Sequence, residues 1–279
     1  WVSWFAELNP RNLIIIEILF LIINMGSIAG YCRKYGTACL DDLCLGDQLL
    51  RRRILSIFPN ALTVMNALMG VLAIFFAHQG RIKEAYLILL GAAFFDKLDG
   101  AVARRLGLTT PLANQKQNKY QITIGGILDD ISDTVSFCIA PALIFYMLME
   151  RFASQINESL PYTWVAIAYA VLGVIRLIFF ILDRNSIPGF FKGLPVPAAA
   201  LLVSAPLIIL DLALVVGSSL LIFWGKLSFW LMIITSVLMN TYFLRYIHVG
   251  RLMSRNRTFL WFTVFIILGF LFTPYFGYA

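Results

Sequence analysis

The sequence predicts an all-α integral membrane protein with about eight transmembrane helices. Of its 279 residues, 60% are hydrophobic and the mean hydropathy is +0.83, a composition typical of membrane proteins. Apolar runs of roughly twenty residues are long enough to cross a bilayer as helices. Eight such runs occur, at residues 12–31, 59–78, 84–101, 122–147, 162–183, 195–216, 227–247 and 258–277.

Residues 1–46 are predicted to hold an additional transmembrane helix and a cytosolic loop, ahead of a main membrane domain at residues 47–279. Three of the four cysteines, Cys32, Cys39 and Cys44, fall in that loop without any CxxC pair. The reducing cytosol argues against disulfides, and a zinc site would need an aspartate of the same loop as its fourth ligand. Free thiols are the simpler interpretation.

Residues 47–58 (DQLLRRRILSIF) are predicted to form a short amphipathic helix ahead of the second span. Its leucines and isoleucines surround three arginines, which is typical of a helix lying in the lipid headgroup layer, with its charges against anionic phosphates. Pro59 is then expected to begin the next helix, because proline suits the first helical position. Asn60, Thr63 and Asn66 follow on one side of that helix, where polar side chains can hydrogen bond neighbouring helices.

The net charge of +7 is distributed unevenly across the predicted membrane. Threading eight spans from an external N-terminus places 15 of the 22 lysines and arginines on one side, five on the other and two within spans. This is the positive-inside pattern, so the richer side is predicted to be cytosolic. The basic residues do not form one block, which argues against nucleic acid as a partner and for membrane lipids.

Carboxylates gather at the ends of two apolar runs. Asp96 and Asp99 are three residues apart, and Asp129 and Asp133 are four apart, so each pair shares one face of a helix. Small residues continue these two faces, namely Gly100, Ala103 and Gly125. If the two helix ends lie side by side, the four carboxylates converge on the predicted cytosolic side.

Such a cluster needs positive charge. Ionised carboxylates near hydrocarbon are costly unless they pair, line a wet cavity or hold cations. Only Lys97, Arg104 and Arg105 lie nearby in the sequence, so divalent metal is the simpler counter-charge. An all-oxygen ligand set favours Mg²⁺, Mn²⁺ or Ca²⁺ over zinc. The alternative is that the aspartates are solvated helix ends facing a loop.

The pattern Asp96-x2-Asp99-Gly100-x2-Ala103-Arg104, followed by Gly125-x3-Asp129-x3-Asp133, resembles the signature of the CDP-alcohol phosphotransferase family of membrane lipid synthases. All eight signature positions are present. Residues 105–124 form a longer spacer than is usual in the family, and we interpret them as an inserted polar loop. The resemblance implies a six-helix membrane bundle, to which the other spans are additional, and a homodimer.

Further runs resemble the phosphatidylserine synthase branch of that family. Residues 133–142 (DTVSFCIAPA) are similar to its DxVSFGxAPA run, with Cys138 at the usual glycine position. Residues 191–200 (FKGLPVPAAA) are similar to FxGLPxPAAA. Arg176 matches the first arginine of that branch's RLARFN run, whereas Phe179 replaces the second. The branch implies serine as the acceptor alcohol and CDP-diacylglycerol as the phosphatidyl donor.

The family resemblance also implies roles for individual residues. Two divalent cations, Mg²⁺ or Mn²⁺, would be held by Asp96, Asp99, Asp129 and Asp133, with Asp133 also the candidate general base. The residues implied to bind the CDP moiety or a phosphate are Asn60, Thr63, Gly100, Ala103, Arg104, Gly125 and Arg176. Residues 59–66 (PNALTVMN) also resemble the entry to the family's first core helix, where such residues lie near the nucleotide diphosphate, and this run includes Asn66.

Two other functions fit parts of the pattern. The same chemistry with another acceptor, such as glycerol 3-phosphate, inositol phosphate or choline, uses the same aspartates. A divalent-cation transporter would use the carboxylates as a pore site, but it needs a polar path to the outer face, and the outer halves of the spans are apolar.

Overall fold

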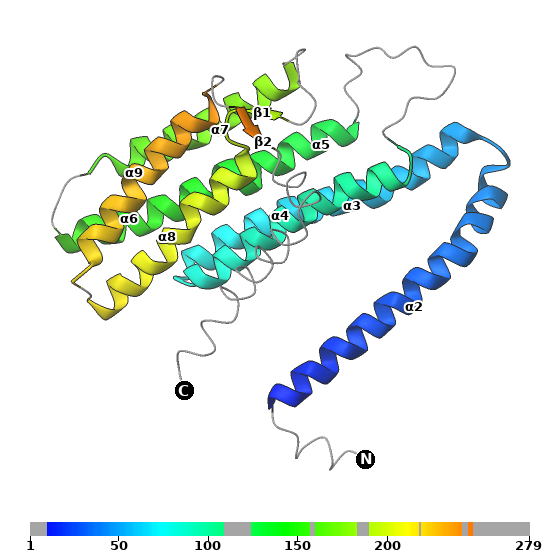
Figure 1. The fold of residues 1–279 in the computed structure, drawn as a ribbon, viewed down its shortest axis with the longest axis horizontal. Coiled ribbons are helices and arrows are strands. Elements are labelled where there is room, and N and C mark those ends of the chain that lie inside the picture. The colour runs from blue at the N-terminus through cyan, green and yellow to red at the C-terminus, as the bar shows by residue number, and fades with distance from the viewer. Residues whose placement is uncertain are drawn as a thin grey trace. The chain divides into compact units, whose positions relative to one another are not determined.

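We analysed a computed structural model, which describes residues 10–108, 124–156, 160–182, 190–217, 219–241 and 245–247 (Figure 1). The described part is almost entirely helical. Its helices are α2 (Pro10–Cys44), α3 (Gln48–His78), α4 (Ile82–Arg105), α5 (Ile124–Asp133), the π-helix η1 (Thr134–Ile139), α6 (Ala140–Ile156), α7 (Tyr162–Leu182), α8 (Val196–Val216) and α9 (Leu221–Met239). Two short strands, β1 (Phe190–Lys192) and β2 (Arg245–Ile247), pair antiparallel, with Phe190 opposite Ile247.

The chain divides into two compact units. The first comprises Trp1–Ile57 and Leu106–Thr110, and the second comprises Phe58–Arg105 and Pro111–Ala279. The boundary near Ile57 falls inside α3. The second unit contains all the predicted site residues.

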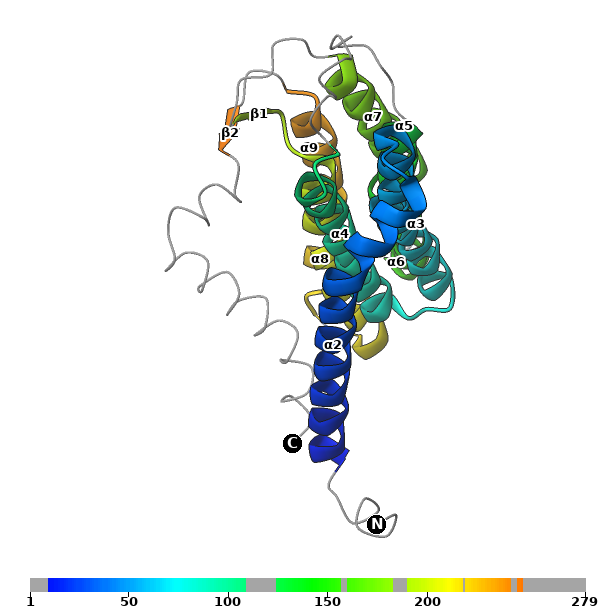
Figure 2. The same ribbon diagram turned by 90° about the vertical axis from the view of Figure 1, so that its right-hand side faces the viewer.

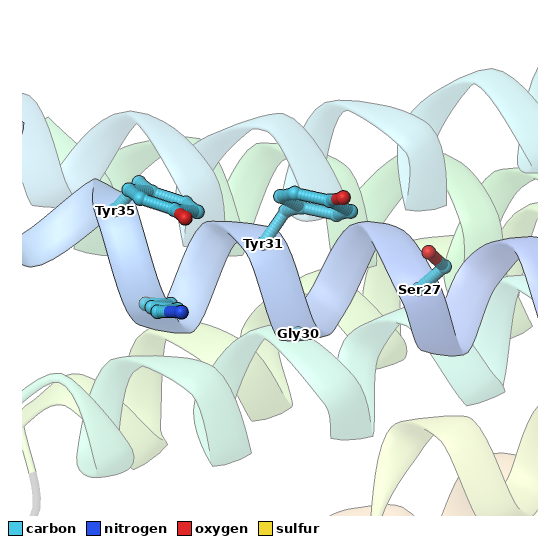
Figure 3. A pocket seen from close by; sticks show the side chains of 5 residues that line it. Ser27, Gly30, Tyr31 and Tyr35 are labelled. Carbon is cyan, nitrogen blue, oxygen red and sulfur yellow. The ribbon is translucent and has the colours of Figure 1, made fainter.

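In the first unit, α2 continues through Cys44 as a single helix. The predicted loop at residues 32–46 is therefore wrong, because no proline interrupts the helix and it ends only where Leu45 and Gly46 adopt positive φ values of 45° and 86°. Cys39 is exposed and Cys44 is buried, and both are free thiols, as is Cys138 in the second unit. An open hollow of about 260 Å³ lies along α2, lined by Ser27, Gly30, Tyr31, Lys34 and Tyr35 (Figure 3). All five residues belong to α2, and none of them is a predicted site residue.

The arginine-rich segment of the first unit begins α3 and has protein partners. Asp47 caps the helix, since its Oδ1 accepts hydrogen bonds from the backbone N–H groups of Leu49 at 2.8 Å and Leu50 at 3.3 Å. Arg51 Nε lies 3.3 Å from Asp41 Oδ1, and Arg52 Nη2 donates to the Gly107 carbonyl at 3.2 Å. Two of the three arginines predicted to face lipid phosphates therefore contact the chain itself.

Pro59 lies inside α3, so the predicted separate amphipathic helix and the predicted helix start at this proline are wrong. A proline within a helix removes one backbone hydrogen bond, and it is tolerated when the residues around it favour the helix and pack its ring. Pro59 is buried, and the Thr63 hydroxyl lies 3.0 Å from its carbonyl oxygen.

The core of the second unit is made by η1 and by residues of α3, α4, α6, α7, α8 and α9. Helices α4, α6, α8 and α9 run lengthwise along one another (Figures 1 and 2). Fully buried side chains fill the space between these helices, among them Leu89, Phe137, Phe145, Tyr169, Leu207 and Met232. Where two helices approach closely, a glycine faces a larger side chain. The aromatic ring of Phe152 on α6 fills the space in which Gly225 of α9 would carry a Cβ atom.

Among the described residues, five helical segments are long and apolar enough to cross a membrane: Gln48–His78, Gly125–Ile156, Tyr162–Leu182, Val196–Val216 and Leu221–Met239. Large apolar side chains on their outer faces are exposed, including Trp164 at 74% and Val215 at 80%, as expected for contact with lipid. The predicted helical membrane fold is thus confirmed. The predicted 12–31 and 84–101 runs lie within α2 and α4, and the 258–277 run lies outside the described residues, so the count of eight stays a prediction.

The predicted span at 227–247 is misplaced. Helix α9 begins six residues earlier, at Leu221, and ends at Met239, so residues 221–226 belong to the helix although they fall between two predicted spans. Leu221 and Trp224 of this first turn pack against the core, whereas Ile222 and Phe223 lie exposed on the outer face. Asn240 ends the helix, and the strand β2 follows.

Candidate metal and substrate site

Three of the four predicted ligands come together between α4 and α5. One carboxylate oxygen from each of Asp96, Asp129 and Asp133 lies within 4.8 Å of the others. Asp129 and Asp133 share a face because they are four residues apart on α5, and Asp96 meets them from α4. Metal–oxygen distances of about 2.0–2.6 Å allow oxygens roughly 4–5 Å apart to share an ion after small side-chain rotations. These three side chains fit a hard divalent cation.

Asp99, the fourth predicted ligand, is buried and faces α3. Its Oδ2 lies 2.7 Å from the Thr63 hydroxyl. The charge of the Asp99 carboxylate interacts with those of Asp96 and Asp129. Asp99 is therefore close enough to the other carboxylates to repel them, while one of its oxygens contacts Thr63. The interaction with Thr63 holds Asp99 in place beside the other three carboxylates.

Lys97 supplies positive charge to this group. Its Nζ lies 2.8 Å from Asp96 Oδ2, although adjacent helical residues normally point about 100° apart. The ammonium charge also acts on Asp99, Asp129 and Asp133. The long side chain of Lys97 is therefore bent towards the concentrated negative charge of the aspartates.

The polar stripe of α3 faces this cluster. Asn60 Oδ1 would lie only 3.0 Å from a Cβ atom added to Gly125, so the small residue at 125 makes room for the amide of Asn60. Thr63 meets Asp99, and Asn66 Nδ2 donates to Asp133 Oδ1 at 3.2 Å. Each member of the stripe thus contacts a signature residue. Sequence reasoning placed Asn66 on the stripe near the diphosphate but did not predict its contact with Asp133.

Serines on both sides of Asp133 join its helix to α3. Ser132 Oγ donates to the Thr63 carbonyl at 2.6 Å, and Ser136 Oγ donates to the Asn66 carbonyl at 2.8 Å. Asp133 is the last residue of α5, and the π-helix η1 follows it directly. Single π-helical turns within α-helices are frequent at functional sites. This turn places Ser136, Phe137 and Cys138 in the interior.

The other small signature residues accommodate their neighbours. A Cβ atom added to Gly100 would lie 3.2 Å from Nη1 of Arg104, so this guanidinium extends back along α4 over Gly100. Ala103 is partly buried and Arg104 is exposed. Arg104 therefore lies at the end of α4 that carries the aspartates, where its charge is available to a phosphate group.

Arg176 is buried within α7, 6% exposed, and its guanidinium carbon lies 5.8 Å from the centre of the Phe180 ring. A buried base within a membrane helix is costly unless a negative group or a dipole lies near it. This burial is compatible with the predicted phosphate contact, which remains a prediction.

The FKGLP run has a structural role. Gly193 has a φ of +76°, and a Cβ atom there would lie 2.5 Å from the Met239 carbonyl oxygen. The Leu194 N–H donates to the Leu238 carbonyl at 3.1 Å, and Pro195 caps α8. The run therefore seats the start of α8 against the end of α9, which requires glycine at position 193.

The Cys138 position is also explained by packing. A Cβ atom on Gly173 of α7 would lie 2.7 Å from Cys138 Sγ, and Tyr169 donates from its hydroxyl to the Phe137 carbonyl at 3.3 Å. The larger residue at 138 is therefore accommodated by a glycine on the neighbouring helix.

Several known proteins are similar in sequence to this chain. A Mycobacterium leprae protein named CDP-diacylglycerol–serine O-phosphatidyltransferase is 33% identical over 153 residues, covering 52% of this chain and 45% of that protein. A Helicobacter pylori protein of the same name is 32% identical over 150 residues, covering 53% and 56%. An archaetidylserine synthase of Methanothermobacter thermautotrophicus is 33% identical over 153 residues, also covering 53% and 56%. The chain thus spans about half the length of these relatives.

No solved structure matches the chain. The model of the family described as CDP-alcohol phosphatidyltransferase matches residues 56–241, which is more than half of the chain and includes both aspartate pairs and the α3 stripe. The chain therefore belongs to the CDP-alcohol phosphatidyltransferase family.

Proposed function

We propose that this protein transfers the phosphatidyl group of CDP-diacylglycerol to L-serine and releases CMP. The observation that carries the proposal is the convergence of Asp96, Asp129 and Asp133 within 4.8 Å in a member of this family. A cluster of this kind, beside the apolar surface of a membrane helix bundle, suits a lipid substrate whose reactive group is a charged diphosphate.

In the proposed reaction, the serine hydroxyl oxygen attacks the phosphorus atom that carries diacylglycerol. The bond from that phosphorus to the bridging oxygen of CMP breaks, and CMP leaves with the bond's electron pair. The hydroxyl proton passes to Asp133, the proposed general base. The barrier is mainly the charge that develops on the phosphoryl oxygens and the leaving group.

The four aspartates suit the divalent cations that the family generally uses. Asp96, Asp129 and Asp133 would hold a cation directly, and Asp99 would complete the set beside Thr63. Two cations, Mg²⁺ or Mn²⁺, would supply charge stabilisation to the phosphoryl group and the leaving group when bound. The chain contributes the fixed positions of these oxygens.

The remaining signature residues are proposed to bind the donor. Gly100, Ala103 and Gly125 lack bulk at the helix ends, which suits a closely approaching cytidine and diphosphate. Arg104 would pair with a substrate phosphate, and Arg176 would offer a second positive charge from α7. Asn60 and Thr63 would act beside the diphosphate from α3, next to Gly125 and Asp99.

Serine is the favoured acceptor for two reasons. Residues 133–142 and 191–200 resemble the serine-using branch, and two of the relatives described above carry serine in their names. The archaeal relative is named for a serine-containing lipid as well. We further propose that the site faces the cytosol and that the protein forms a homodimer.

The test is a CMP-release assay on the purified full chain in detergent. CDP-diacylglycerol is offered with serine, glycerol 3-phosphate, inositol phosphate or choline in separate reactions, each with Mn²⁺ or Mg²⁺ and with a chelator. We expect release with serine that the chelator abolishes. Release with another alcohol but not with serine would transfer the assignment to that acceptor. Divalent-cation flux in liposomes without CMP release would instead support a transporter.

A further inference from the structure

Asn66 is a buried amide whose contact crosses between helices. It lies on α3 with no exposed surface, and its Nδ2 donates to Asp133 Oδ1 at 3.2 Å. Its Oδ1 is also buried and has no hydrogen-bond partner within the described residues. A buried amide without full pairing is costly, so a side chain of this kind is retained for a contact that apolar residues cannot make.

The backbone around this amide is held on both sides of Asp133. The hydroxyls of Ser132 and Ser136, one turn apart, donate to the Thr63 and Asn66 carbonyls. Ser136 also lies against Gly70 of α3, where an added Cβ atom would be 2.7 Å from the Ser136 Cα. These contacts fix the separation and register of α3 against α5 and η1 at Asp133.

Asp133 needs such a restraint because its neighbours repel it. One of its oxygens lies within 4.8 Å of oxygens of Asp96 and Asp129, and both of those carboxylates act on it electrostatically. A carboxylate on a free χ1 torsion rotates away from like charges. A hydrogen bond from a neutral donor to a charged acceptor opposes this rotation, and a carboxylate has lone pairs left for a second partner.

We propose that Asn66 is a positioning residue, which holds the Asp133 carboxylate in the aspartate cluster through its side-chain N–H. The serines Ser132 and Ser136 keep the backbone of α3 at the distance that this contact needs. The proposal deepens the proposed function, because it concerns the residue assigned there as general base. The first measurement that tests the role of Asn66, however, is the affinity for Mn²⁺ in the absence of substrate.

The experiment compares Asn66→Leu with a matched control, Asn240→Leu, in the purified full chain. Asn240 is also a partly buried amide that donates across helices, from Nδ2 to the Leu172 carbonyl at 3.0 Å, and within the described part of the chain it has no carboxylate partner. Leucine is close to asparagine in shape and cannot donate. Mn²⁺ affinity is measured by electron paramagnetic resonance without substrate, Tm by thermal unfolding, and kcat and KM by CMP release at saturating Mn²⁺.

We expect Asn66→Leu to weaken Mn²⁺ binding about tenfold, the usual loss when an outer-shell partner of a metal ligand is removed. At saturating Mn²⁺, kcat falls at least about tenfold while KM for CDP-diacylglycerol changes less than about threefold, because positioning acts on the reacting geometry. Asn240→Leu lowers Tm to a similar extent but leaves Mn²⁺ affinity and kcat near wild type.

Equal Mn²⁺ affinity in Asn66→Leu, Asn240→Leu and wild type would overturn the proposal. If Asn66→Leu does not fold, Ser136→Ala takes its place, since it keeps the amide and loosens only its backbone. We then expect a loss of Mn²⁺ affinity of about threefold, and no loss would overturn the proposal. Should wild type bind Mn²⁺ but release CMP with no alcohol, the proposed function fails while the Mn²⁺ comparison still decides the role of Asn66.

Discussion

Gly70 on α3 lies directly against Ser136 of the π-helix η1. A Cβ atom at position 70 would come within 2.5 Å of Ser136 Oγ and within 2.7 Å of its Cα. Because the second contact is to backbone, the helices would have to move apart to admit even one methyl group. The approach of these two residues sets the distance at which α3 presents its polar stripe to the aspartates.

Gly70→Ala should therefore destabilise the protein and separate α3 from η1. Overpacking a close contact typically costs about 1–3 kcal/mol, and we expect a loss in this range together with weaker Mn²⁺ binding. Thermal unfolding in detergent measures the first effect. Gly91→Ala is the matched control, because its added Cβ would meet only the flexible end of Met69, at 3.3 Å. A Gly70→Ala protein as stable as Gly91→Ala would contradict the close packing described here.

Asp129→Asn should abolish transfer while the protein stays folded in the membrane. The amide removes one of the three converging carboxylates, so Mn²⁺ affinity should fall at least about tenfold and CMP release about a thousandfold or more. Asp130→Asn is the control, because Asp130 follows Asp129 on the helix but does not belong to the converging group of described carboxylates. Full activity in Asp129→Asn would refute the role of the cluster.

Thr63→Val tests the support of Asp99. Valine keeps the shape of threonine and removes the hydroxyl that lies 2.7 Å from Asp99 Oδ2. We expect a decrease in kcat/KM of about tenfold, since a carboxylate beside the proposed cation site loses a neighbour that orients it. Thr235→Val provides the comparison, because among the described residues the Thr235 hydroxyl bonds to carbonyls of its own helix alone, at Leu231 and Met232. Equal effects of the two substitutions would show that Thr63 acts only on helix stability.

Lys97→Met should tighten cation binding. The ammonium group lies 2.8 Å from Asp96 Oδ2, so its positive charge opposes the binding of a cation beside the same carboxylate. Removing it should raise Mn²⁺ affinity about threefold, and the gain should shrink at high salt, because Lys97 is exposed and its charge is screened. Lys226→Met, on α9, should leave the affinity unchanged. Weaker Mn²⁺ binding in Lys97→Met would show that the ammonium group supports the site instead.

Sequence reasoning recovered the helices whose apolar runs are long and uninterrupted. The runs at 162–183 and 195–216 correspond closely to α7 and α8. It failed at the boundaries that depend on packing. Pro59 continues α3, where it is buried, and residues 221–226 join α9, where Gly225 packs against the Phe152 ring.

In the aspartate cluster, too, sequence reasoning found the features that lie within one helix and missed the contacts between helices. Helical spacing predicted that each pair of aspartates shares a helix face, and the signature residues pointed to all four. The interaction of Thr63 with Asp99, the amide of Asn66 on Asp133 and the glycine at 173 opposite Cys138 all join residues far apart in the chain. No local pattern reports which faces of two helices meet.

The order of residues along the chain determined which side chains share a helix face, because helical periodicity is a local property. It also determined which segments prefer lipid, because the transfer of a segment out of water depends on that segment's own composition. Only the tertiary structure decided that α3 supports the aspartates. The contacts of Thr63 and Asn66 form only when small residues such as Gly70 let whole helices approach, and that approach is a property of the packed bundle.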